Sequence, residues 1–252
     1  MSYWSLVRSV VESADVVVEV LDARFPNLSR NKKLEGFVKE KGKTLVFLFN
    51  KSDLVDSSFV RNIASSFGSN CVFMSAKLRR GVVALKKLLS KFSFGKTIKV
   101  AFVGYPNTGK SSIINLLKGK KSAPTSFRAG FTKGLQNIRV SSNVVVIDTP
   151  GVIPVENFDE SLLVVLSSKN SEDISDLESV GLDVAKLVLK CDPNGVKSLY
   201  NISASSPESL LESLALVRGK LKRGALPDIS AAAKILIDDV QSGKLKIFEG
   251  VL

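Results

Sequence analysis

The chain has 252 residues, 44% hydrophobic and 24% charged, which suits a globular protein with one core of about 150 residues and a smaller second one. It has no histidine, which excludes histidine catalysis and histidine metal ligation. Residues 1–150 hold 25 basic and 9 acidic side chains, whereas residues 151–252 hold 11 and 15. Because the first part is so positive, we expect a polyanionic partner, most simply RNA; lysines that merely keep the protein soluble are the alternative.

Targeting and redox features are few. No stretch approaches the ~20 apolar residues of a membrane span. Glu12, Asp15 and Glu19 make the first twenty residues unlike a secretory signal or a transit peptide. Cys71 and Cys191 form no C-x-x-C motif, so neither a metal site nor a disulfide is predicted. We therefore expect a cytoplasmic monomer that does not associate with membranes.

Short β-branched or aromatic runs alternate with helical patterns through the first 150 residues. Strands are predicted over 16–21, 44–49, 71–74, 98–103, 135–140 and 144–147, the last two as an antiparallel pair. Helices are predicted over 5–13, 29–41, 56–66, 82–92 and 110–117. This alternation predicts an α/β fold over residues 1–157, with a doubly wound, mostly parallel sheet. Residues 158–252 are predicted to form a smaller all-α domain, with helices over 176–190, 207–221 and 228–242 and turns at 192–195 and 223–227.

One octet identifies a ligand class. The segment Gly104-Tyr105-Pro106-Asn107-Thr108-Gly109-Lys110-Ser111 fits G-x-x-x-x-G-K-[ST], the phosphate-binding loop of nucleotide hydrolases, between a predicted strand and a predicted helix. Its backbone N–H groups should hold the α and β phosphates. Lys110 should reach the β and γ phosphates, and the Ser111 hydroxyl should bind Mg²⁺. The expected phosphate-binding residues are Asn107, Thr108, Gly109, Lys110, Ser111 and Ser112.

Two further motifs follow predicted strands and point to guanine. In Asn50-Lys51-Ser52-Asp53, the Asp53 carboxylate can accept hydrogen bonds from the N1–H and the amino group of guanine, a donor pair that adenine lacks. We expect Lys51 to lie along the base. In Ser75-Ala76-Lys77 the Ala76 N–H is expected to donate to the guanine O6. The motifs together predict GTP and GDP as ligands.

The remaining motifs are expected to act at the γ-phosphate and its Mg²⁺. Asp148-Thr149-Pro150-Gly151 follows the last predicted strand, so Asp148 should hold Mg²⁺ through water and the Gly151 N–H should sense the γ-phosphate. Thr132 is the candidate switch threonine that closes on Mg²⁺, and an ordinary loop threonine is the alternative. Lys110, Thr132 and Gly151 are therefore the candidate catalytic residues.

The order of these motifs is rotated relative to an ordinary G domain, because the guanine motif precedes the phosphate loop. In this order the chain resembles the circularly permuted GTPases of ribosome assembly, the YlqF/RbgA group. Asp22-Ala23-Arg24-x-Pro26 resembles that family's segment before the guanine motif. Leu216-x-x-Arg218-Gly219-x-Leu221, followed by Pro227-Asp228 and Ala231-Ala232, resembles its helical domain in outline.

The resemblance implies GTP hydrolysis coupled to maturation of the large ribosomal subunit, with rRNA as partner and activator. The helical domain would dock on RNA by shape or through a local basic patch formed by Arg218, Lys220, Lys222 and Arg223; a passive lid on the G domain is the alternative. Asn107 matches the asparagine that helps to coordinate a monovalent cation in potassium-stimulated relatives, which implies K⁺ beside the phosphates and adds Asn107 to the candidate catalytic residues. A loop-capping role for Asn107 is the alternative.

Two departures bear on hydrolysis. The N-terminal histidine of bacterial members is missing, and Val152-Ile153 stand where Ras-type enzymes have a glutamine that orients water. No general base is assigned, and intrinsic turnover should be slow. Two other functions stay open: a GTP-dependent RNA placeholder with negligible hydrolysis, and a G protein in tRNA modification or in regulation unrelated to ribosomes.

Overall fold

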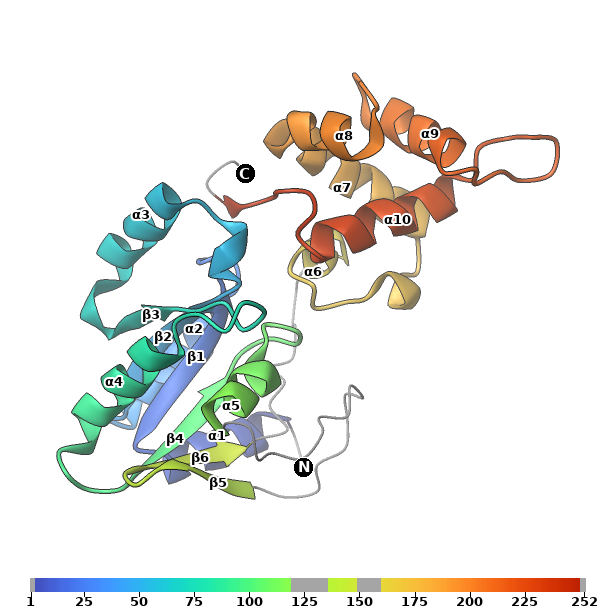
Figure 1. The fold of residues 1–252 in the computed structure, drawn as a ribbon. Helices are drawn as coiled ribbons and strands as arrows, with labels where there is room; N and C mark the ends of the chain where they lie inside the picture. Colours follow the sequence, from blue (N-terminus) through green and yellow to red (C-terminus); the bar gives the residue numbers. More distant parts are fainter. Residues whose placement is uncertain (1–2, 119–135, 149–159, 250–252) are drawn as a thin grey trace. The chain divides into compact units, whose positions relative to one another are not determined.

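The computed structural model describes residues 3–118, 136–148 and 160–249. The chain divides into two compact units, Met1–Pro154 and Val155–Leu252. The boundary that we expected after residue 157 lies outside the described residues. The first unit is an α/β structure and the second is helical (Figure 1). Among the described helices none is long and apolar enough to span a bilayer.

A six-stranded sheet forms the centre of the first unit, in the order β3-β2-β1-β4-β6-β5. All neighbouring strands are parallel except β5, which runs antiparallel to β6. This confirms the predicted α/β class and the antiparallel pair. The strands are β1 (Val16–Asp22), β2 (Thr44–Asn50), β3 (Cys71–Phe73), β4 (Ile98–Val103), β5 (Gln136–Ser141) and β6 (Val144–Asp148).

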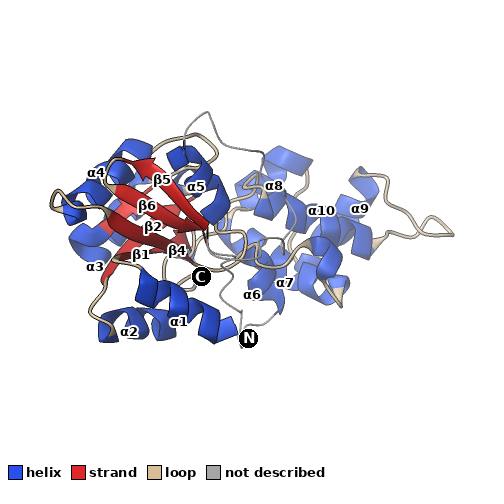
Figure 2. Cartoon of the chain, turned by 90° about the horizontal axis from the view of Figure 1, so that it is seen from below, coloured by secondary structure: helices blue, strands red, loops and turns tan. Residues whose placement is uncertain are grey.

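Helices cover both faces of this sheet, and Figure 2 shows α4 and α5 on one face with α1 and α2 on the other. The helices of this unit are α1 (Tyr3–Ser13), α2 (Lys32–Glu40), α3 (Ser57–Phe67), α4 (Val82–Ser93) and α5 (Lys110–Lys118). Every residue of β1 is buried, because the strand lies between β2 and β4 and has helices on both faces.

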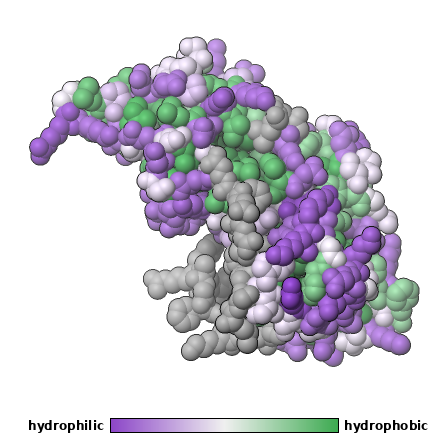
Figure 3. Space-filling view, turned by 180° about the vertical axis from the view of Figure 1, so that it is seen from behind, coloured by the Kyte–Doolittle hydropathy of each residue, from purple (hydrophilic) through white to green (hydrophobic). Residues whose placement is uncertain are grey.

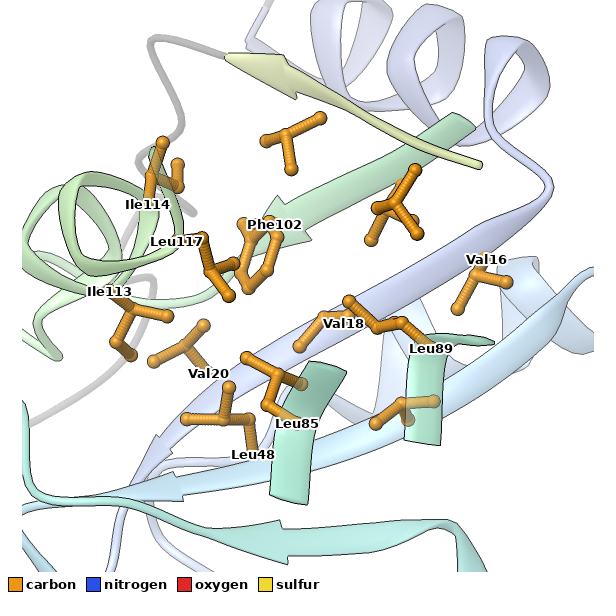
Figure 4. Close-up of a cluster of buried hydrophobic side chains, with 14 of the residues drawn as sticks. Val16, Val18, Val20, Leu48, Leu85, Leu89, Phe102, Ile113, Ile114 and Leu117 are labelled. Atoms are coloured by element: carbon orange, nitrogen blue, oxygen red, sulfur yellow. The ribbon is translucent and has the colours of Figure 1, made fainter. Parts of the chain in front are cut away.

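The larger core cluster lies beneath α4 and α5 (Figure 4). Val16, Val18 and Val20 of β1 point into it because alternate residues of a strand share a face. The two helices contribute Leu85, Leu89, Ile113 and Leu117. A smaller cluster contains Leu21, Phe49 and Ile63. On the face seen in Figure 3, hydrophilic side chains predominate, with hydrophobic ones between them.

Helix α2 begins three residues later than the predicted start at Ser29. Asn31 caps the helix, since its side chain accepts from the Leu34 N–H at 2.9 Å. The Asn31 N–H in turn donates to Glu19 Oε1 of β1 at 2.7 Å. Ser29 instead closes a turn, where its Oγ donates to the Phe25 carbonyl at 2.6 Å and accepts from the Asp22 N–H at 3.1 Å. The N-terminal part of the predicted helix is thus wrong.

The second unit contains α6 (Glu160–Val165), α7 (Leu177–Cys191), α8 (Pro193–Tyr200), α9 (Pro207–Val217) and α10 (Ile229–Gln241). Three short 3₁₀ turns complete the described elements, at Ser52–Leu54, Gly68–Asn70 and Ser171–Asp173. Helices α7, α9 and α10 pack on one another. A Cβ at Gly181 of α7 would lie 2.3 Å from the Ala233 Cβ, so glycine permits the close approach of α7 and α10.

Two predictions for this unit were wrong, and one further helix was missed. Residues 192–195 begin α8 instead of forming a turn: Asp192 accepts from the Gly195 N–H at 3.0 Å and Pro193 takes the first helical position. Helix α9 ends at Val217, four residues early, because residues 218–228 form a loop with an antiparallel bridge between Leu221 and Pro227. Helix α6 was not predicted.

Candidate guanine-nucleotide site

The predicted motifs follow neighbouring strands at the same edge of the sheet. β1, β2, β3, β4 and β6 are parallel, so their carboxyl ends share that edge. Open α/β sheets bind ligands at this edge. Asp22 and Asn50 end β1 and β2 in register, and the phosphate loop follows β4. Segments that are distant in sequence therefore meet there.

Asn50 joins three of these segments. Its Nδ2 donates to the Thr108 carbonyl at 2.8 Å, and its Oδ1 accepts from the Ala76 N–H at 3.0 Å. The side chain is buried, and a Cβ at Gly109 would lie 2.1 Å from Asn50 Nδ2, so only glycine fits there. Ala76 N–H, the expected donor to guanine O6, donates to Asn50 in this structure. The guanine motif thus ties the phosphate loop to the Ser-Ala-Lys segment.

The phosphate loop has backbone geometry that explains both glycines. Gly104 has φ +147° and Gly109 has φ +96°, a region that L side chains rarely adopt. A Cβ at Gly104 would lie 2.4 Å from the Val20 carbonyl oxygen, so β1 and the loop approach closely. Thr108 is buried and its Oγ1 donates to the Tyr105 carbonyl at 3.0 Å, which closes the loop on itself.

Other predicted phosphate ligands lie at the surface. Asn107 is exposed at the loop's apex with φ +56°. Ser111 and Ser112 are exposed in the first turn of α5. The helix N-terminus adds its positive dipole end to these donors, and a lone hydroxyl such as that of Ser111 suits Mg²⁺, which completes its octahedron with phosphate and water oxygens. The described residues contain no cluster of three or more His, Cys, Asp or Glu that could hold a metal ion.

Lys110 lies against its own loop. Its Nζ donates to the Gly104 carbonyl at 2.8 Å and to the Tyr105 carbonyl at 2.6 Å. Burial lowers the pKa of the Lys110 amine from 10.5 to about 7. Near neutral pH the charged and the neutral form of this amine are therefore both populated.

Lys51 contacts a buried network that we had not assigned to the site. Its Nζ lies 2.8 Å from Asp22 Oδ2, and the Arg24 guanidinium binds the same carboxylate through Nε at 3.1 Å and Nη2 at 2.9 Å. Burial alone would raise the pKa of Asp22, but the charges of Arg24 and Lys51 outweigh it and hold that pKa far below its usual range. The only sequence signal was the Asp-Ala-Arg-x-Pro segment, to which we gave no role.

The carboxylate of Asp53 is half-buried, and it makes no hydrogen bond or ion pair with the part of the chain that the structure describes. Ser75 is buried and its Oγ accepts from the Leu78 N–H at 3.0 Å, while Lys77 is exposed. Thr132 and Gly151 lie outside the described residues. Asp148 ends β6 opposite Gln136, and the structure does not describe its side chain.

Comparison with known proteins gives consistent matches. A family model described as 50S ribosome-binding GTPase matches residues 99–205. The chain is 36% identical to a GTP-binding protein of Methanocaldococcus jannaschii over 97% of its own length and 66% of that protein. It is 33% identical to nucleolar GTP-binding protein 2 of Yarrowia lipolytica, covering 97% of the chain and 50% of that protein. The chain thus spans half to two thirds of these curated relatives.

Among solved structures, GNP-bound YlqF from T. maritima matches with a TM-score of 0.73 and 27% identity, over 97% of this chain and 96% of that one. The GDP-bound form of that protein matches with a TM-score of 0.69. The sheet, the phosphate loop after β4 and the guanine motif before it define a G domain of permuted order. The chain belongs to the YlqF-like circularly permuted GTPases, a family related to nucleolar GTP-binding proteins.

Proposed function

We propose that this chain binds GTP and GDP with Mg²⁺, hydrolyses GTP slowly, and acts as a switch in assembly of the large ribosomal subunit with rRNA as its partner. The observation that carries the nucleotide part is the bridge made by Asn50, which holds the phosphate loop at Thr108 and the Ser-Ala-Lys segment at Ala76. This bridge fixes the distance between the phosphate-binding and base-binding segments.

Each residue has one task in this proposal. Asp53 accepts from the guanine edge, and Lys51, which the Asp22 carboxylate orients, lies along the base. The N–H groups from Asn107 to Ser112 receive the phosphates, and Lys110 exchanges its carbonyl partners for phosphate oxygens. Ser111, Thr132 and Asp148 would hold Mg²⁺, which neutralises charge between the β and γ phosphates.

Fewer residues of this chain can be assigned to hydrolysis than to nucleotide binding. Val152 and Ile153 cannot orient water, so a monovalent cation at Asn107, the substrate or the RNA partner must assist. The name of the matched family model, the GNP- and GDP-bound relatives and the nucleolar relatives support a guanine nucleotide and a ribosomal partner.

Nucleotide choice is tested by calorimetric titration of the full chain with GDP and with ADP in magnesium buffer. We expect uptake of GDP only, because the Asp53 carboxylate finds its donor pair only on guanine. Absence of GDP uptake, or equal uptake of ADP, would contradict the proposal.

The ribosomal part is tested by sedimentation through a sucrose gradient with a non-hydrolysable GTP analogue. We expect a peak with the large subunit or its precursor, and none at that position points to regulation unrelated to ribosomes. Single-turnover hydrolysis in KCl, with and without ribosomal particles, then separates an enzyme from a placeholder: no acceleration by any particle favours the placeholder.

A further inference from the structure

The first unit contains a long span without acidic side chains. From Ser57 to Ile147 the sequence has 16 lysines and arginines and no aspartate or glutamate. The nucleotide site uses only Lys77 and Lys110 of this set. The surplus of positive charge in this span is therefore not explained by the bound phosphates.

Helix α4 presents three of these charges to solvent. Lys86, Lys87 and Lys91 are exposed, whereas Leu85 and Leu89 are buried against the sheet. Lys87 and Lys91 are one turn apart, so they lie on one side of the helix, away from the sheet. A shallow hollow of 530 Å³ lies on this side. We define the α4 face as Val83, Lys86, Lys87, Ser90, Lys91 and Phe94.

No carboxylate neutralises the lysines of the α4 face among residues 3–118, 136–148 and 160–249. The basic loop of the second unit differs, because Lys222 lies 3.5 Å from Glu178 and 4.0 Å from Asp228. The loop that we expected to dock on RNA thus has part of its charge compensated within its own unit. The α4 face keeps its full charge for a partner.

An exposed aromatic ring lies at the end of this face. Phe94 follows the last residue of α4, is 87% exposed, and has φ +43°. A bulky residue rarely adopts positive φ, and such strained positions concentrate at functional sites. Unpaired bases of RNA stack on exposed aromatic side chains of this kind.

We propose that the α4 face binds the phosphate backbone of RNA, with Phe94 stacking on an unpaired base. This deepens the proposed function and rests on it for the choice of RNA among polyanions. Lysines bind phosphates as point charges and read no sequence, so the contact positions the protein on its partner. A membrane surface fits less well, because the apolar side of α4 is buried against the sheet and cannot enter a bilayer.

The test compares two double variants of the full chain with GDP bound. Lys87→Gln with Lys91→Gln removes two charges from the α4 face, and Lys32→Gln with Lys39→Gln removes two charges from α2 on the other side of the sheet. The probe is a fluorescently labelled, single-stranded RNA of about 20 nucleotides, followed by anisotropy from 50 to 200 mM KCl. We expect the first variant to lower the slope of log K against log salt by about 1.4, and the second to leave it near the parent value.

Phe94→Gly keeps the positive φ and removes the ring, so it should weaken RNA binding about tenfold without changing the salt slope. Parent-like RNA binding by the α4 double variant overturns the proposal. So does a loss of binding to phosphatidylserine vesicles or to polyglutamate without a loss for RNA. GDP titration of each variant keeps the outcomes separate: loss of RNA binding with intact GDP uptake supports the α4 face even where the gradient test of the ribosomal role fails.

Discussion

The Lys110 amine donates to two carbonyls of its own loop, and its protonation state affects nucleotide binding. Burial lowers its pKa to about 7. Phosphate oxygens near the amine favour the ammonium form, so the pKa rises when nucleotide binds. Above pH ~7 the protein must therefore take up a proton on binding GDP, and its affinity should fall as pH rises above about 7.

The measurement is calorimetric titration with GDP at pH ~8 in two buffers of different ionisation enthalpy. The phosphates of GDP are fully ionised there because their second pKa is near 6. We expect uptake of close to one proton, and Lys110→Arg, which stays charged, should remove the uptake in any complex that it forms. Binding of GDP without proton uptake by the parent chain would contradict this account of Lys110.

The motif pattern alone selected the residues of the candidate site, but it did not give their hydrogen bonds. Gly104, Gly109 and Lys110 were predictable because the phosphate loop imposes a fixed spacing. The contacts of Asn50 were not, since its partners Ala76 and Thr108 lie 26 and 58 residues away and only the sheet brings them together. The burial of Asp22 with Arg24 and Lys51 depends likewise on tertiary packing.

At the scale of elements, Glu19 links strand β1 to the start of α2. It is fully buried at the centre of the sheet, its Oε1 accepts from the Asn31 N–H, and Oε2 has no partner among the described residues. Burial raises its pKa from 4.5 to about 8. The folded chain thus keeps this proton between those values while the unfolded chain loses it, so folding stability falls as pH rises through that window.

Glu19→Gln should therefore stabilise the fold at pH ~8 by about 2 kcal/mol, because glutamine keeps the acceptor for Asn31 and removes the ionisation. The gain should shrink toward pH ~4.5, where the parent side chain is protonated in the folded chain and about half protonated in the unfolded chain. Urea unfolding at the two pH values measures it, with Glu12→Gln at an exposed ion pair as the control. A gain that does not change with pH would contradict protonation of Glu19.

The strands were predicted well because β-branched runs between turn residues allow few other structures, and β4 was found with its bounds unchanged. Helices of the second unit were harder. Pro193, Asn194 and Gly195 are turn residues by composition, and only the cap made by Asp192 shows that a helix begins there. Helix α6 is six residues long, which is too short for a periodic pattern to be recognised.

At the scale of the whole molecule, the permuted order of the motifs changes which part of the protein follows Gly151, the expected γ-phosphate sensor. The last strand along the chain, β6, ends at Asp148. The chain then continues through Gly151 to the helical unit that begins at Val155. In an unrotated G domain the same segment leads back into the sheet. A nucleotide can shift two conformations only through contacts that differ between them. We propose that Gly151 supplies that difference and that the short connection passes it to the second unit.

Gly151→Ala should accordingly bind GTP but lose the difference in ribosome affinity between the GTP-analogue and GDP states. Sedimentation with ribosomal particles in each nucleotide measures that difference, and it is the ratio between states that decides, not the affinity in either one. Gly36→Ala is a matched control, because a Cβ there meets no atom within 4 Å. If Gly151→Ala keeps the parent's ratio, the signal leaves the nucleotide by another route, and the rotated order of motifs has no part in transmitting it.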